Sequence, residues 1–155
     1  MMLLLVFHLG AERFALDTGR VVEVLPLVHF RPLPQAVAGI AGIFNYHGAT
    51  VPLVDLATLA LGSASKSRMS TRIILVEYKP AAGGTHLLGL LAERTTETIR
   101  REESDFAETG VAVDGAPYLG PVTRDARGLI QRVEVNRLLS GSVRDVLFRQ
   151  PMETP

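Results

Sequence analysis

Residues 42–56 read Gly42-Ile-Phe-Asn-Tyr-His-Gly-Ala-Thr-Val-Pro-Leu-Val-Asp-Leu56, two strand-like runs joined by a tight turn. Asn45 and Gly48 bracket the turn, and Gly48 tolerates the positive φ angle that short hairpin turns require. The second run supplies the apolar side chains of a half-buried strand. Its Pro52 favours an edge position, because proline lacks the amide hydrogen that a central strand donates. The stretch therefore predicts a β-hairpin at the rim of a sheet, where a partner can reach it.

The rest of the chain predicts a protein built mainly from short strands. Strand-forming runs recur between Gly, Pro, Asn and Asp residues, a spacing typical of barrels and sandwiches. They cover residues 3–9, 13–16, 21–27, 40–44, 50–56, 72–78, 85–92, 95–100 and 129–135. Helical pattern is limited to one or two turns at Leu56–Leu61, a turn at Ser104–Glu108, and a terminal helix over Ser142–Gln150 with Ser142 as its cap. The fold class predicted is therefore all-β with a short C-terminal helix.

A weak internal repeat indicates that two similar small barrels make up the chain. The aligned segments are Phe14–Leu25 with Leu88–Ile99 and, with one gap, Gly48–Leu59 with Gly128–Leu138. The first alignment places Glu23 over Glu97. Small polar residues at 63–70 predict the boundary between the halves or a loop.

Length and composition exclude several classes of protein. The chain has 155 residues, the size of one domain, and its 16 basic and 16 acidic residues cancel. Because no dense Lys/Arg run occurs either, a nucleic-acid-binding protein is not expected. The absence of cysteine excludes disulfides, thiolate catalysis and Cys-ligated zinc. We predict a single domain over residues 1–150 and a frayed tail over 151–155.

The N-terminal residues Met1–Phe7 are apolar, but no basic region precedes them and no small-residue cleavage site follows. They predict a first strand rather than a signal peptide. No apolar run reaches about 18 residues, so no direct membrane insertion is expected. We therefore expect a cytoplasmic protein that reaches a membrane only through its partners.

No arrangement of residues indicates catalysis, a metal site or a cofactor. The histidines His8, His29, His47 and His86 lie far apart, and none has the spacing of a helical zinc motif. Phosphate-binding and nucleophile-elbow motifs are missing as well. Asp55 lies where a carboxylate caps the next helical turn, and we prefer this structural interpretation to a catalytic acid. The sequence therefore predicts no catalytic residues, no metal, no cofactor and no enzyme.

Residues 42–56 resemble the corresponding stretch of the CheW family, the coupling proteins of bacterial chemosensory arrays. The family motif there runs Gly-hydrophobic-x-Asn-Leu-Arg-Gly-x-x-hydrophobic-Pro-hydrophobic-hydrophobic-Asp-Leu. The match continues upstream in Phe14–Asp17, in Val21–Leu25 and in Pro32–Pro34. Looser matches downstream extend the resemblance over nearly the whole chain. They are Leu88–Leu91, Tyr118–Gly120 and Gly128–Ile130, followed by Leu138–Leu139.

The resemblance implies one CheW-like domain made of two small five-stranded SH3-like β-barrels around a shared hydrophobic interface. The first barrel is expected at about residues 10–62 and the second at 71–139, with the N-terminal strand pairing with the second barrel. The implied function is a non-catalytic adaptor that couples methyl-accepting chemoreceptors, at their cytoplasmic tips, to the regulatory domain of a CheA-type histidine kinase. Some family members serve surface sensing or cyclic-dinucleotide signalling instead of swimming. A non-flagellar output and self-association are both compatible with this chain.

By the resemblance, a strand and a turn of the first barrel form one partner-binding surface. Its candidate residues are Val22, Glu23, Val24, Asn45, Tyr46 and His47. Strand alternation places the Glu23 side chain opposite the two valines, so we expect it to be exposed. His47 and Tyr46 stand where the family normally has Arg and Leu. Arginine clamps a carboxylate with two hydrogen bonds, whereas histidine offers one and titrates near neutrality. Drift at a surface turn and a changed partner explain this departure equally well.

Two alternatives to the coupling function are left open. One, from another class, is a small-ligand-binding or enzymatic β-barrel with a site between the two halves and Asp55 or a histidine as its acid or base. The other is a scaffold that binds only the kinase or only the receptor.

Overall fold

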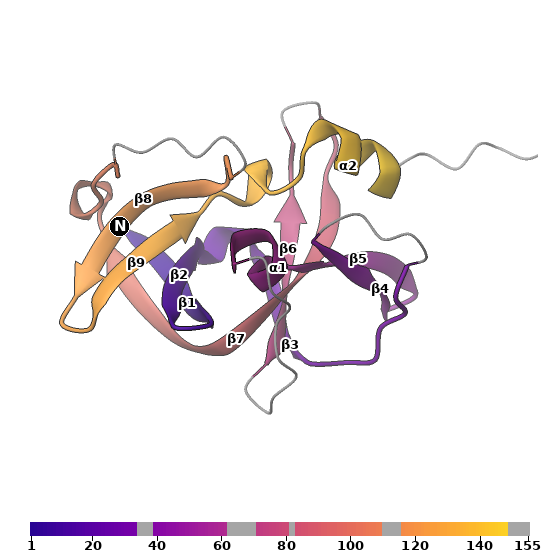
Figure 1. Cartoon of the computed structure of the whole chain (residues 1–155), viewed down its shortest axis with the longest axis horizontal. Helices are drawn as coiled ribbons and strands as arrows, with labels where there is room; N and C mark the ends of the chain where they lie inside the picture. The colour runs from indigo at the N-terminus through magenta and orange to yellow at the C-terminus, as the bar shows by residue number, and fades with distance from the viewer. Residues whose placement is uncertain (34–38, 62–70, 81–82, 110–115, 149–155) are drawn as a thin grey trace, which may run out of the picture.

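The computed structural model describes residues 1–33, 39–61, 71–80, 83–109 and 116–148 (Figure 1). The expected connection at 63–70 and the expected tail at 151–155 lie outside these ranges. The strands are β1 (Met2–Leu9), β2 (Glu12–Asp17), β3 (Val21–Pro26), β4 (Ile40–Tyr46), β5 (Ala49–Asp55), β6 (Arg72–Tyr78), β7 (His86–Arg101), β8 (Leu119–Asp125) and β9 (Gly128–Val133). The helices are α1 (Leu56–Leu61), α2 (Gly141–Leu147) and the 3-10 turns η1 (Thr18–Arg20), η2 (Glu103–Asp105) and η3 (Val135–Arg137). The all-β prediction is confirmed.

The long strand β7 belongs to two five-stranded sheets. Its residues 86–92 pair with β6 and, in part, with β5, while residues 93–101 pair with β1. Barrel A, as we call it, contains β8, β9, β2, β1 and the second half of β7. Barrel B contains β3, β6, the first half of β7, β5 and β4. Figure 1 shows β7 curving from one set of strands to the other, with the β8–β9 hairpin on the left and the β4–β5 hairpin on the right.

Each sheet curls far enough for a neighbouring segment to bridge its open side. In barrel B, Arg31 and Ile43 exchange two backbone hydrogen bonds of 2.8 and 2.9 Å, which connect the segment after β3 to β4. In barrel A, Ala107 and Val122 exchange bonds of 2.8 and 2.9 Å, which connect the segment after β7 to β8. Two equivalent bridges therefore close two equivalent sheets.

The two barrels interleave in sequence. The strands β1 and β2 lie with β8 and β9 in barrel A, whereas β6 and the first half of β7 lie with β3, β4 and β5 in barrel B. The division expected from the sequence, 10–62 and 71–139, differs from this arrangement in β2 and in residues 72–92. The repeat itself agrees with the structure, because β5 runs parallel to the first half of β7 as β9 runs parallel to β2. A repeat shows which strands are equivalent, but not which partners each strand takes.

Three clusters of buried side chains form the core. The largest lies between the barrels and includes Leu5, Phe7, Leu16, Ile74, Leu88 and Leu90. The cluster inside barrel B contains Phe44, Val51, Leu53, Ile73, Leu75 and Leu91. The cluster inside barrel A contains Leu4, Val6, Ala15 and Ile130. Alternate residues of β1 thus enter two different clusters, which is why the strand is apolar from Met2 to Phe7 rather than only at every second position.

The strand β5 lies inside its sheet, so the edge position predicted for Pro52 is wrong. β5 pairs with β4 on one side and with β7 on the other. Pro52 is buried opposite Ile43, one residue before the parallel pairing with β7 begins at Leu53. The missing amide hydrogen is tolerated there because the β7 ladder starts only after the proline.

The two α-helices are short and are capped by side chains. Asp55 Oδ1 accepts hydrogen bonds from the backbone N–H groups of Ala57 (3.1 Å) and Thr58 (3.4 Å), which confirms its predicted role as the cap of α1. The cap of α2 is Ser140 rather than the predicted Ser142, since Ser140 Oγ accepts from the N–H of Val143 at 3.3 Å. Residues 149 and 150 of the predicted helix lie outside the described ranges. Within those ranges, no helix is long and apolar enough to cross a membrane.

A side chain at Gly89 would clash with the core of barrel B. A Cβ there would lie 2.5 Å from Phe44 Cε1 and 3.0 Å from Ile73 Cγ2, both in the barrel B core. We expect Gly89→Ala to lower the free energy of unfolding by about 1–3 kcal/mol through overpacking. Denaturant unfolding measures the change. The matched control is Gly141→Ala, where a Cβ would meet only the end of the Arg144 side chain at 3.3 Å, and this control should not lose stability. Equal stabilities of the two variants would contradict the packing argument.

Candidate functional site

The six predicted partner-binding residues lie on two neighbouring segments of barrel B. We call Val22, Glu23, Val24, Asn45, Tyr46 and His47 the seam surface. The Tyr46 hydroxyl at the end of β4 donates a hydrogen bond of 2.8 Å to Glu23 Oε2 on β3. In the described residues, β3 is paired along its length only with β6. The side-chain bond therefore connects the two segments where no strand pairing does.

The β3 part of the seam surface exposes apolar as well as charged side chains. Val22 and Val24 are 45% and 40% exposed, and Glu23 between them is exposed too. The exposure of Glu23 is as predicted, but alternation alone did not predict exposed valines. A bulge between Val21 and Glu23 interrupts the pairing with β6, and the three residues after Val21 are all exposed. An exposed edge strand with apolar side chains is a place where another chain can bind.

The turn between β4 and β5 has the geometry of a two-residue hairpin loop. Tyr46 pairs with Ala49, and the loop residues His47 and Gly48 both have positive φ angles, 48° and 87°. Such turns require positive φ at both central positions. The sequence predicted this for Gly48 but not for His47, a residue type that tolerates the left-handed region better than most. Asn45 Oδ1 accepts from the N–H of Gly48 at 3.0 Å, so this side chain stabilises the turn.

The two aromatic side chains of the turn contact one another beside Glu23. The rings of Tyr46 and His47 lie edge to face, with centroids 4.4 Å apart. The Glu23 carboxylate accepts a hydrogen bond from the Tyr46 hydroxyl and thereby raises the pKa of Tyr46, and desolvation and the negative charge of Glu23 add to the effect. Tyr46 is therefore a neutral donor near neutral pH. The arrangement can bind a partner surface but places no base near a nucleophile.

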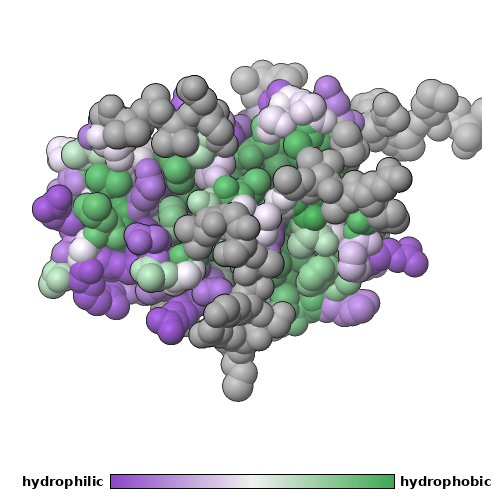
Figure 2. All heavy atoms as spheres, viewed as in Figure 1, coloured by the Kyte–Doolittle hydropathy of each residue, from purple (hydrophilic) through white to green (hydrophobic). Residues whose placement is uncertain are grey.

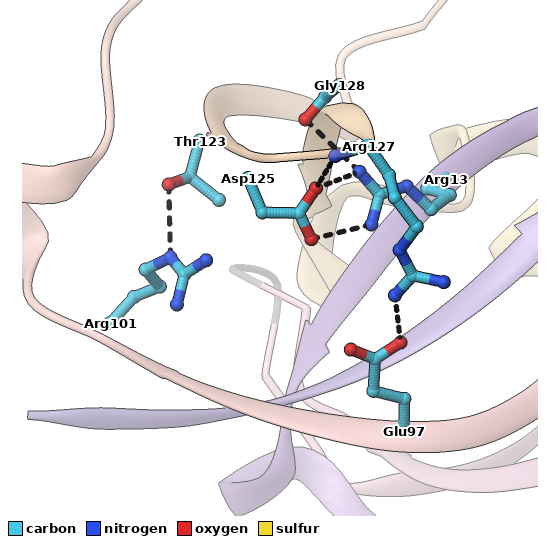
Figure 3. A network of polar contacts seen from close by, with 7 residues as sticks. All are labelled: Arg13, Glu97, Arg101, Thr123, Asp125, Arg127 and Gly128. Carbon is cyan, nitrogen blue, oxygen red and sulfur yellow. Dashed lines mark hydrogen bonds and ion pairs between the residues drawn. The ribbon is translucent and has the colours of Figure 1, made fainter.

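A second polar cluster, which the sequence did not reveal, lies at one end of barrel A (Figure 3). Arg13 donates to both carboxylate oxygens of Asp125, at 2.8 and 2.5 Å, and to the carbonyl of Gly128 at 3.1 Å. Its side chain is only 7% exposed. The only signal in the sequence is that Arg13 directly precedes the apolar run Phe14–Leu16. The cluster joins β2 to the β8–β9 hairpin.

The electrostatics of this cluster are those of a structural ion pair. The hydrogen bonds from Arg13 and from the backbone N–H of Arg127 hold the pKa of Asp125 well below its usual range. The bond to Asp125 in turn raises the pKa of Arg13. Burial, together with the positive charges of Arg94, Arg13 and Arg127, lowers the pKa of His8. Among the described residues, no group of three His, Asp or Glu side chains is placed to hold a metal ion.

A polar hollow of about 180 Å³ lies at the opposite end of barrel A. It is lined by Met2, Asp17, Arg20, Glu103, Arg132, Val133, Glu134, Val135 and Asn136. Arg132 donates to Glu103 and to Glu134, both at 3.2 Å, and lies over the Phe106 ring at 4.7 Å. Asp55, the acid considered for a site between the halves, caps α1 and does not line this hollow.

The fold is that of a module made of two small β-barrels that share one strand. Residues 3–143 match the CheW-like domain family, and the chain belongs to that family. Proteins of this family are scaffold proteins rather than enzymes.

Individual relatives agree with this assignment. The chain is 26% identical over 147 residues to the chemotaxis protein CheW of Treponema pallidum, covering 88% of this chain and 81% of that protein. It is 25% identical over 100 residues to the chemotaxis protein CheW of Helicobacter pylori, covering 64% of this chain and 58% of that protein. The crystal structure of the scaffolding protein TtCheW from Thermoanaerobacter tengcongensis has the same fold, with a TM-score of 0.73 at 23% identity over 85% of this chain and 83% of that one.

The low pKa of Asp125 makes its contribution to stability dependent on pH. Because the pKa of Asp125 in the folded protein lies below its unfolded value of about 3.9, the ion pair stabilises the protein at pH values above about 3.9. This stabilisation is lost as the pH falls toward the folded-state pKa. We therefore expect Asp125→Asn to lower the melting temperature at neutral pH, with a difference from wild type that shrinks below about pH 4. Thermal unfolding monitored by circular dichroism over a pH series measures both. A difference that stays constant down to strong acid would contradict the ion-pair account.

Proposed function

We propose that this chain is an adaptor that couples methyl-accepting chemoreceptors to a CheA-type histidine kinase in a bacterial chemosensory array. Its membership of the CheW-like domain family and its relatives named chemotaxis protein CheW support the proposal. The partners proposed are the regulatory domain of the kinase and the cytoplasmic tip of the receptor. An adaptor has to offer two surfaces at once, and a molecule with two barrels has room for both.

The seam surface is the observation that carries the proposal. Glu23 and Tyr46 come from separate segments and are held together by a hydrogen bond of 2.8 Å, so their side chains are positioned before any partner arrives. The exposed Val22 and Val24 flank the carboxylate with apolar area. Preorganised polar groups beside exposed apolar side chains lower the entropic cost of forming a complex.

We extend the proposal to an array whose output is not swimming, such as surface sensing or cyclic-dinucleotide signalling. The support is chemical. Tyr46 and His47 replace the usual Leu and Arg of the family motif, so a neutral hydroxyl rather than a guanidinium contacts Glu23. Deletion of the gene tests this extension: loss of swimming chemotaxis would contradict it, while a defect in surface behaviour with normal swimming would support it.

A binding experiment tests the adaptor function directly. The purified chain is mixed with the kinase regulatory domain and, separately, with the receptor tip from the same genome, and complexes are measured by size-exclusion chromatography. Binding to both supports the coupling function, and binding to one alone supports a narrower scaffold. If the folded chain binds neither the kinase domain nor the receptor tip, the proposal is overturned.

Reversing the charge of Glu23 should weaken binding without unfolding the protein. We expect Glu23→Lys to reduce affinity about tenfold or more, because it breaks the Tyr46 bond and reverses the charge at the centre of the seam surface. The melting temperature should hold, since the side chain is exposed. Titration calorimetry measures the affinity. The control is Glu12→Lys, the same exposed charge reversal on β2 of barrel A. A Glu23→Lys variant that binds like this control would remove Glu23 from the site.

Replacing His47 tests whether the turn contacts a partner. An arginine is always charged and can clamp a carboxylate with two parallel hydrogen bonds, which a histidine cannot do. We expect His47→Arg to change the affinity for the partner that covers the turn, because the new side chain is larger and carries a charge beside Glu23. Titration calorimetry of wild type and variant measures the change. Identical affinities would show that the substitution at this position is silent.

A further inference from the structure

Glu23 and Glu97 occupy equivalent positions in the two barrels. Glu23 lies on β3 opposite Leu75 of β6, directly after a bulge in that pairing. Glu97 lies on the second half of β7 opposite Val6 of β1, again beside a break in the register. The strands correspond as well. In barrel B, β6 lies between β3 and the first half of β7, and in barrel A, β1 lies between the second half of β7 and β2. Each carboxylate also reaches across to the hairpin turn of its own barrel.

The two equivalent carboxylates differ in their neighbours. Glu97 Oε2 accepts from the guanidinium of Arg127 on the β8–β9 turn at 2.7 Å, a contact labelled in Figure 3, so its charge is compensated within the chain. Glu23 Oε2 accepts from the neutral hydroxyl of Tyr46 at 2.8 Å. Within the described ranges, no Lys, Arg or His nitrogen makes an ion pair with Glu23. Barrel B therefore presents an uncompensated negative charge where barrel A presents a neutral pair.

The surroundings of Glu23 make this charge costly to bury. Val22 and Val24 on either side are exposed, so a partner that covers them also removes water from the carboxylate between them. A carboxylate that loses its water without gaining a cation or further donors opposes binding. Tyr46 satisfies Oε2 but supplies no charge, and among the described residues no hydrogen bond to Oε1 is recorded. A partner that binds here with useful affinity has to supply the missing cation itself.

We infer that the partner of the seam surface carries a lysine or arginine, set among apolar side chains, that forms an ion pair with Glu23. The inference rests on the proposed adaptor function and adds the chemistry by which this chain recognises its partner. The apolar side chains cover Val22 and Val24, and the basic group binds the free oxygen of Glu23. Tyr46 positions the carboxylate through its hydrogen bond, whereas the positive charge of the partner binds Glu23 and not Tyr46.

The test compares Glu23→Gln with Glu97→Gln, the same change at the equivalent place in barrel A. Both substitutions keep the size of the side chain and remove only its charge. The probes are the kinase regulatory domain and the receptor tip, each titrated against the full chain at low and high salt. For the probe that binds the seam surface, we expect Glu23→Gln to weaken affinity about tenfold at low salt and to flatten its salt dependence. Glu97→Gln should retain both the affinity and the salt dependence of wild type.

The outcomes separate this inference from the function on which it rests. Wild-type binding together with an unchanged affinity and salt dependence in Glu23→Gln would overturn the inference and leave the adaptor function standing. Equal losses in Glu23→Gln and Glu97→Gln would also overturn it, because they would report the net charge of the chain rather than a local pair. If the wild-type chain binds neither probe, both the inference and the adaptor function are overturned. Melting temperatures of the two variants confirm that both are folded.

Discussion

The structure depends on β7, the strand that both barrels share. Its first half completes barrel B beside β5 and β6, and its second half completes barrel A beside β1. Where the strand passes between the barrels, Arg94 has a φ angle of 48° and the pairing with β1 shifts. Side chains of both barrels fill the large cluster beside this junction. Neither barrel has its full set of strands without the other, so the two form as one unit.

The two barrels have the same architecture but present different surfaces. Equivalent strands carry Glu23 in barrel B and Glu97 in barrel A, but the turns opposite them supply a tyrosine and an arginine. Figure 2 shows hydrophilic residues gathered over the β8–β9 end of barrel A and more apolar surface over barrel B. The two barrels thus present equivalent positions of the same geometry, and a few turn residues give these positions different charge.

Much of the local structure follows from short patterns. The hairpin at residues 42–56 and the cap formed by Asp55 both appear as predicted, because turn chemistry and capping depend on residues within a few positions of one another. Patterns that depend on distant neighbours were less informative. Pro52 indicated an edge strand, yet β5 is interior, since its pairing with β7 begins only after the proline. The valines of β3 were expected to alternate with Glu23, but all three residues are exposed.

The sequence by itself determined the all-β class and the two-fold repetition, because these depend on local propensity and on patterns contained in short segments. Tertiary structure decided which strands form each barrel, that Arg13 is buried against Asp125, and that Tyr46 rather than a cation holds Glu23. These contacts join residues that lie 23 to 112 positions apart. Such pairs form only when strands from different parts of the chain are brought side by side, and no local pattern encodes that choice of neighbour.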